Sequence, residues 1–246
     1  MYGNFAAVYD SLMADVDYEK RTDYLLKLFK KYGKMPTLML DVACGTGGFS
    51  NCFAKRGVEV IGADMSEEML SIAREESAIQ GNDILYLCQK AQELDLYGTV
   101  DGAICCLDSL NHITDYRDFC KALKRIALFL EEGSLFIFDL NTEYKHKSVL
   151  GDNVFVIDND DVYCVWANSF NKKDCSVDIA LDFFVKENDA YYKTSEEFSE
   201  RAYSAAQVDS ALKKAGLQII GIFDDMTTKP LKKTSERAVY VTKRVK

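Results

Sequence analysis

The chain has 246 residues, of which 48% are hydrophobic, enough to bury the core of one α/β domain with an elaboration. Its formal net charge of −9 argues against a nucleic-acid backbone or an anionic membrane as the main partner, because both require a local excess of Lys and Arg. No apolar run approaches the roughly twenty residues that span a bilayer and no signal-peptide pattern is seen, so we expect a cytoplasmic protein.

Two helices are expected before the first strand. The second should cover about residues 18–32, because Gly33 and Pro36 supply a stop signal. The first is indicated by apolar residues at helical spacing, which predict an amphipathic helix on the core. These residues are Phe5, Val8, Tyr9, Leu12 and Met13.

A glycine-rich turn between two strands is the most informative pattern. An apolar strand, Leu38–Val42, runs into Ala43-Cys44-Gly45-Thr46-Gly47 and a helix expected over residues 49–56. Such a turn puts unpaired backbone N–H groups at a strand's carboxyl end, where open α/β sheets bind ligands. The next strand, 58–64, ends in Asp64, where a carboxylate can accept hydrogen bonds from two ribose hydroxyls. The first hypothesis is therefore nucleoside binding.

Two phosphate-binding motifs are not met. A dinucleotide fingerprint needs a third glycine where Ser50 stands, and a P-loop needs Gly-Lys-Ser/Thr, which is absent. The stretch Asp41-Val42-Ala43-Cys44-Gly45-Thr46-Gly47 instead resembles motif I of the class I S-adenosylmethionine-dependent methyltransferases. The resemblance covers residues 35–145 well and both ends more loosely. It implies S-adenosylmethionine as cofactor, with its methionine part on the loop and its ribose on Asp64.

The resemblance also implies further cofactor contacts. Small-molecule methyltransferases often begin with a Tyr-x-x-x-Ala-x-x-Tyr-Asp segment that folds over the cofactor, which makes Tyr2 and Tyr9 candidates for lid contacts. Relatives often carry an acid for the adenine where Lys90 stands, so adenine recognition is expected around Ala91 or Gln92. The implied cofactor-binding residues are Asp41, Ala43, Gly45, Thr46, Gly47, Asp64, Met65, Ala91, Gln92, Leu107, Asp108 and Tyr2. For Met65, filling of the core is the alternative.

Three further elements are expected between the glycine turn and the next polar cluster. Ser66, followed by Glu67 and Glu68, predicts the start of a helix. Strands are expected over residues 84–88 and 100–106. The second of these leads directly into polar residues.

Polar side chains follow the strand at 100–106. They belong to Asp108-Ser109-Leu110-Asn111-His112 and should lie on the sheet's carboxyl edge, beside the glycine turn. The stretch resembles motif IV of the same methyltransferases, which lies near the reactive methyl group. Asp108 is either part of this site or the N-cap of the following helix. Asp115 gives a second start signal for that helix and could be its N-cap instead. We take Asp108, His112 and Tyr9 as candidate catalytic proton acceptors, with a structural role as the alternative for His112.

The second half of the chain combines helices, strands and a β-rich insertion. A helix over residues 116–130, closed by Gly133, should lead to a strand at 134–139. An antiparallel meander is predicted next, with strands expected at 154–157, 162–168, 176–186 and 190–198. It can cover the ligand site at the carboxyl edge of the main sheet. A helix at 205–215 and strands at 217–223 and 238–242 follow. The last two match the antiparallel hairpin that ends the class I methyltransferase sheet.

The expected fold is α/β, a Rossmann-like seven-stranded methyltransferase sheet with a terminal antiparallel hairpin and an inserted antiparallel β cap. Residues 1–144 and 203–246 would form the S-adenosylmethionine-binding domain, with 1–33 as a helical lid, and residues 145–202 a substrate cap. The eight cysteines contain no Cys-x-x-Cys pair and only two histidines accompany them, so we expect reduced thiols and no metal.

The expected function is methyl transfer to an unidentified small-molecule acceptor by direct in-line displacement. The sequence leaves nitrogen, oxygen and carbon open as the acceptor atom and is compatible with a homodimer. A non-catalytic S-adenosylmethionine-binding regulatory protein is one alternative. An NAD-dependent oxidoreductase is a less favoured one, because the third glycine is missing and the terminal hairpin is foreign to a dehydrogenase sheet.

Overall fold

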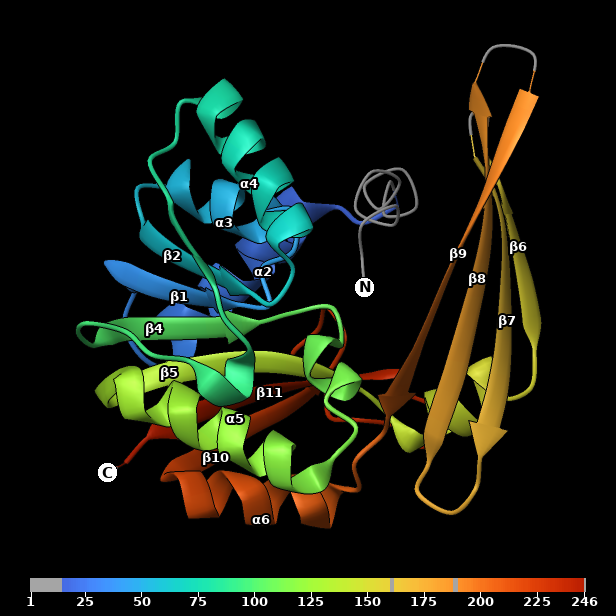
Figure 1. Ribbon diagram of the computed structural model, residues 1–246. Helices are drawn as coiled ribbons and strands as arrows, with labels where there is room; N and C mark the ends of the chain where they lie inside the picture. The colour runs from blue at the N-terminus through green and yellow to red at the C-terminus, as the bar shows by residue number, and fades with distance from the viewer. Residues whose placement is uncertain (1–14, 160–161, 188–189, 246) are drawn as a thin grey trace.

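The computed structural model describes residues 15–159, 162–187 and 190–245 (Figure 1). Tyr2, Tyr9 and the first expected helix lie outside the described residues. The main sheet has seven strands in the order β10-β11-β5-β4-β1-β2-β3, as the resemblance predicts. Strands β1 to β5 are parallel to their neighbours in that group, and β11 is antiparallel to both β5 and β10. The strands are β1 Leu38–Val42, β2 Glu59–Asp64, β3 Leu85–Cys88, β4 Val100–Cys105, β5 Leu130–Asn141, β10 Leu217–Asp224 and β11 Arg237–Arg244.

Helices cover both faces of this sheet. In Figure 1, α2, α3 and α4 lie on one face, and α5 and α6 on the other. Each layer buries its own apolar cluster, one built around Phe29 and Phe53 and the other around Phe119 and Leu212. The helices are α2 Tyr18–Tyr32, α3 Gly48–Ala54, α4 Glu67–Gln80, α5 Tyr116–Phe129 and α6 Ala205–Ala215. All helices in the described part of the chain are too short or too polar to cross a bilayer.

The predicted helix ends that depend on local chemistry are confirmed. The Ser66 hydroxyl accepts a hydrogen bond from Met69 N at the start of α4. Asp115 caps α5 by accepting from Arg117 N and Asp118 N, so Asp108 is not the cap of this helix. Gly216 ends α6 in the left-handed conformation.

The predicted end of α5 and the predicted start of β5 were wrong. Gly133 does not close α5, because the helix ends at Phe129 and β5 begins at the next residue, Leu130. Leu130 pairs with Val100 on β4, and an irregularity follows before Gly102 pairs with Leu135. Gly133 lies inside β5 with φ of 82°, so its positive φ serves this bulged strand rather than a helix end.

The insertion forms a separate four-stranded antiparallel sheet, here named the cap, in the order β6-β7-β8-β9. Figure 1 shows it standing beside the main sheet at the end toward which β4 points. Its own apolar cluster includes Cys164, Val177 and Phe183. The strands are β6 Val154–Asp158, β7 Val162–Asn171, β8 Ser176–Glu187 and β9 Ala190–Arg201, and the irregular helix η3, Lys145–Leu150, links β5 to them.

Candidate functional site

A cavity of about 390 Å³ lies at the carboxyl edge of the main sheet. Its wall comes from the turn after β1, the end of β2, α4, the segment after β3 and the segment between β4 and α5. Of the candidate cofactor-binding and catalytic residues, seven line it. They are Ala43, Gly45, Asp64, Met65, Ala91, Gln92 and His112.

The two glycines of the turn after β1 have different roles. Both have positive φ, +54° at Gly45 and +81° at Gly47. A Cβ on Gly45 would meet no heavy atom within 4 Å, and Gly45 lines the cavity, so this backbone is open to a ligand. A Cβ on Gly47 would lie 2.5 Å from the Tyr86 hydroxyl. Gly47 therefore serves packing of the turn, and it does not line the cavity.

Asp64 joins the turn to the end of β2. One carboxylate oxygen accepts from Gly45 N at 2.9 Å and the other from Ser66 N at 2.9 Å. Burial raises the pKa of Asp64, although these backbone hydrogen bonds oppose the shift. Each oxygen keeps a lone pair for a ligand hydroxyl, because a carboxylate has about four acceptor positions.

Asp41 lies beneath the turn rather than in the cavity wall. Its side chain is buried and accepts a hydrogen bond from the Ser50 hydroxyl at 2.6 Å. Burial raises the pKa of Asp41 to about 7. Thr46, Leu107 and Asp108 are likewise not among the residues that line the cavity.

The chain turns sharply where β4 ends. Leu107 and Asp108 both have φ of 54°, a strained conformation for residues with side chains. The Asp139 carboxylate at the end of β5 holds this turn by accepting from Leu107 N at 2.9 Å and from Asp108 N at 2.8 Å.

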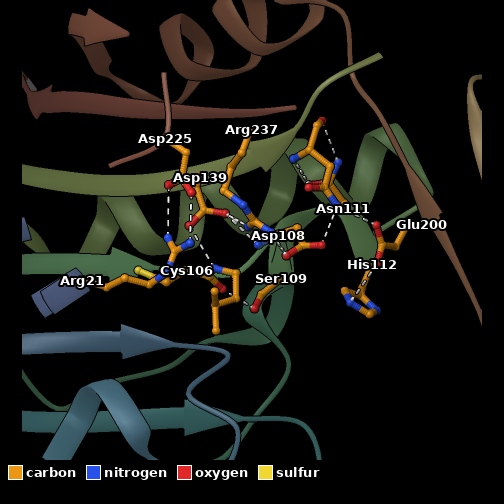
Figure 2. A network of polar contacts seen from close by, with 12 residues as sticks. Arg21, Cys106, Asp108, Ser109, Asn111, His112, Asp139, Glu200, Asp225 and Arg237 are labelled. Atoms are coloured by element: carbon orange, nitrogen blue, oxygen red, sulfur yellow. Dashed lines mark hydrogen bonds and ion pairs between the residues drawn. The ribbon is translucent and has the colours of Figure 1, made fainter. Parts of the chain in front are cut away.

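Arg237 connects the two carboxylates of this turn. It donates to Asp139 and lies 2.8 Å from an oxygen of Asp108. Figure 2 shows it at the centre of a chain of polar groups that runs from Arg21 and Asp225 to Glu200 and His112. Burial alone would raise the pKa of Asp108, but Arg237 outweighs it, with help from Lys145 and His112, and holds that pKa well below its usual range. The Asp108 carboxylate is therefore ionised at neutral pH.

His112 lies in the cavity wall beside the cap. Its ring stacks on Phe198 of β9 with centroids 5.0 Å apart, and its Nε2 is 3.7 Å from Oε1 of Glu200. Phe198 is the cap residue in contact with this imidazole. It supports the only histidine that lines this cavity.

Several residues of the cavity wall were not found from the sequence. They are Met69, Gln89, Ile113, Thr114 and Asp118. Met69 could have been found, because the Ser66 cap places it in the first turn of α4, facing back toward the end of β2. Within the described residues, no group of three or more His, Cys, Asp or Glu is arranged to hold a metal ion, and the eight cysteines are free.

The aromatic side chains of the cap pack on one another or face solvent. Trp166 packs edge-on against Phe155 at 5.7 Å, while Tyr191 and Tyr192 are more than half exposed. Phe184 packs against Tyr163.

Comparisons with known proteins agree on one family. The family model of the methyltransferase domain matches residues 39–133. YqeM of Bacillus subtilis, provisionally named a methyltransferase, is 30% identical over 247 residues, covering 100% of this chain and 98% of its own. The crystal structure of an S-adenosylmethionine-dependent methyltransferase from Clostridium acetobutylicum has a TM-score of 0.91 at 35% identity, covering 100% and 99%. The S-adenosylmethionine-bound structure of CalS10, an amino pentose methyltransferase from Micromonospora echinaspora, shares the fold, with a TM-score of 0.79 at 16% identity over 97% of each chain.

Replacing Asp41 should change how stability depends on pH. With a pKa near 4 when unfolded and about 7 when folded, Asp41 binds more protons in the native state. The free energy of unfolding of the ligand-free protein should therefore fall as pH rises through this window, by about 4 kcal/mol at most. Asp41→Asn, which can still accept from Ser50, should lack this fall. Urea unfolding at about pH 5 and about pH 8 measures the free energy of unfolding of both proteins. The same change between the two pH values in wild type and Asp41→Asn would contradict the prediction.

Replacing Arg237 should cost more stability than replacing Arg21. Arg237→Met leaves the Asp108 and Asp139 carboxylates buried and uncompensated, so we expect a loss of about 3–5 kcal/mol. Arg21→Met is the control, because the Arg21 and Asp225 side chains are 23% and 29% exposed and such pairs contribute about 1 kcal/mol or less. Equal losses in urea unfolding would show that Arg237 is not the more important cation.

Proposed function

Because this chain belongs to the class I S-adenosylmethionine-dependent methyltransferases and takes its methyl group from S-adenosylmethionine, we propose that it methylates a nitrogen or oxygen of a small polar acceptor. The observation that carries this proposal is the placement of His112. Its imidazole lines the cofactor cavity next to the Asp108 turn, where an acceptor's proton can be received.

The cavity residues suit S-adenosylmethionine. Asp64 offers carboxylate oxygens to ribose hydroxyls, Met65 and Ile113 offer apolar surface to the adenine, and Gly45 leaves backbone open for the methionine part. The volume of about 390 Å³ is in the range of small-molecule sites. When bound, the cofactor supplies a methyl group already activated on a sulfonium, so the protein's task is alignment and removal of water.

The acceptor enters, in this proposal, from the side of β5 and β11. A second cavity of about 470 Å³ lies there, with Lys145, Lys232 and Arg237 in its wall. Arg237 pairs with Asp108, and Ser109, the next residue, lines the first cavity. The Asp108 turn thus stands between the two cavities. In-line displacement needs the acceptor and the departing sulfur on opposite sides of the methyl carbon, so the acceptor must pass the Asp108 turn and reach the first cavity, where His112 lies.

The proton of the acceptor passes to His112 rather than to Asp108. A nitrogen or oxygen nucleophile must lose a proton on methylation, and a base with a strongly lowered pKa is a poor proton acceptor. Asp108 is held ionised by Arg237 and has that property. We assign Asp108 the role of fixing the turn between the cavities, and His112 the role of base.

The remaining assignments follow the chain's organisation. Residues 1–144 and 203–246 form the cofactor-binding domain, and residues 145–202 the cap that takes part in acceptor selection. We place the reaction in the cytoplasm, where eight free thiols remain reduced.

Alanine at the two turn glycines should separate ligand binding from packing. Gly45→Ala adds a methyl group at the open backbone and should weaken binding of S-adenosylhomocysteine by about tenfold or more, with about 1–2 kcal/mol of strain. Gly47→Ala should lower the free energy of unfolding by about 1–3 kcal/mol more than Gly45→Ala does, because the new methyl group collides with the Tyr86 hydroxyl. The affinity of the folded protein for S-adenosylhomocysteine should stay within a fewfold of the original. Calorimetric titration and urea unfolding measure both. Unchanged affinity of Gly45→Ala for S-adenosylhomocysteine would show that Gly45 does not contact the cofactor.

Removing the proposed base should affect turnover more than binding. Small amines and alcohols are screened for release of S-adenosylhomocysteine, and the best acceptor is used with His112→Asn. We expect kcat to fall by about 10²–10⁴, with the affinity for S-adenosylhomocysteine within a fewfold. Wild-type kcat in the variant would exclude His112 as the base. Cofactor binding without turnover of any acceptor would favour the non-catalytic alternative.

A further inference from the structure

A second histidine, His146, lies buried behind the site and has no role in the function proposed above. It is in the first turn of η3 and its side chain is fully buried. Its Nδ1 lies 3.2 Å from the carbonyl oxygen of Cys175, in the turn between β7 and β8. A carbonyl only accepts, so Nδ1 carries the hydrogen of this bond.

The other ring nitrogen of His146 faces a carboxylate. Nε2 is 3.4 Å from Oε2 of Glu200 and has no hydrogen-bond partner in the described part of the chain. In a neutral imidazole with hydrogen on Nδ1, Nε2 is an acceptor. Two acceptors would then face each other in a buried site, which is unfavourable unless a proton lies between them.

Glu200 connects this buried pair to the proposed base. Its side chain is 6% exposed, and its Oε1 lies 3.7 Å from Nε2 of His112. Asn141 Nδ2 donates to Oε2 of Glu200 at 3.1 Å and to Asp108 at 2.5 Å. The carboxylate is thus held between two imidazoles and joined to the Asp108 turn through one amide.

The other charged groups around this cluster are engaged elsewhere. Arg201, next to Glu200 on β9, donates to Thr114 O and Asp174 O. From β11, Arg237 pairs with Asp108 and Asp139, and from η3, Lys145 acts on Asp108. Lys147 of η3, with Glu143 and Asp174, faces the thiol of Cys175.

We propose that His146 and Glu200 hold one proton between them, and that this buried pair positions His112 as the proton acceptor of methyl transfer. A proton on Nε2 of His146 keeps Glu200 ionised without leaving an unpaired buried charge. An ionised Glu200 favours the tautomer of His112 with hydrogen on Nε2, which leaves Nδ1 basic. The second half of the proposal rests on the proposed function.

The proton balance is simple. The acceptor's lone pair forms the new bond to the methyl carbon while the electron pair of the carbon–sulfur bond stays on sulfur. The acceptor's proton moves to Nδ1 of His112, and Glu200 stabilises the resulting imidazolium. The proton between Glu200 and His146 is not consumed.

Nitrogen NMR tests the buried proton without any methyl transfer. The chain has only two histidines, so histidine labelled with ¹⁵N gives two ring systems, which His112→Asn assigns. In the full-length protein at neutral pH, we expect Nε2 of His146 to carry or share a proton, because the buried ring otherwise faces Glu200 acceptor to acceptor. In Glu200→Gln we expect that proton on Nε2 of His146 to be absent. A bare Nε2 on His146 at neutral pH in the wild type would overturn the proposal.

Two His146 variants test the positioning role. His146→Gln retains a donor toward Glu200, whereas His146→Asn retains one toward Cys175. We expect kcat to stay within about tenfold in His146→Gln and to fall further in His146→Asn, with S-adenosylhomocysteine affinity unchanged in both. Equal activities would overturn the positioning role. A protonated His146 in a protein that methylates nothing would instead contradict the proposed function and leave the buried pair intact.

Discussion

The ion pair between Arg237 and the two carboxylates of Asp108 and Asp139 is the constraint on which the rest of the site depends. Asp139 accepts from both N–H groups of the strained turn at Leu107 and Asp108. Two ionised carboxylates at one buried turn repel each other unless a cation joins them. β11 supplies that cation because it runs antiparallel to β5, which brings its first residue to the carboxyl edge. The terminal hairpin therefore does more than extend the sheet, since its Arg237 neutralises the two carboxylates of the turn after β4.

The parts of the fold that follow from the sequence are those whose causes lie close together in the chain. The turn after β1 and the acid that ends β2 are separated by about twenty residues in one strand-turn-helix-strand unit, and both are where the pattern predicts. Gly133 was misread because a glycine after an apolar helical face is a stop signal, whereas pairing of Leu130 with β4 decided the boundary. Arg237 and Glu200 had no local signal. They reach the site through the register of β11 on β5 and of β9 on β8, which their own neighbours do not specify.

The cap and the cavity at the carboxyl edge of the main sheet are joined through one segment. The segment between β4 and α5 is bound to the base of β9 by hydrogen bonds from Asn111 Nδ2 to Arg201 O, from Tyr203 to Ile113 O and from Arg201 to Thr114 O. Ile113 and Thr114 line the cavity. Three hydrogen bonds therefore hold this wall to the base of β9 and to Tyr203 directly after it.

The charges of the cavity also bear on turnover. Its wall carries the carboxylates of Asp64, Asp115 and Asp118 against the ammonium of Lys90. A sulfonium cofactor has one positive charge more than the thioether left after transfer. An acidic wall in a partly desolvated cavity attracts the cofactor more strongly than the product, because Coulomb interactions strengthen as water is removed. The resemblance implies an adenine-binding acid at the position that Lys90 occupies. The wall nevertheless remains acidic through Asp118 of α5 and Asp115, the N-cap residue of that helix. In the function proposed above, this acidic wall favours exchange of spent product for a new methyl donor.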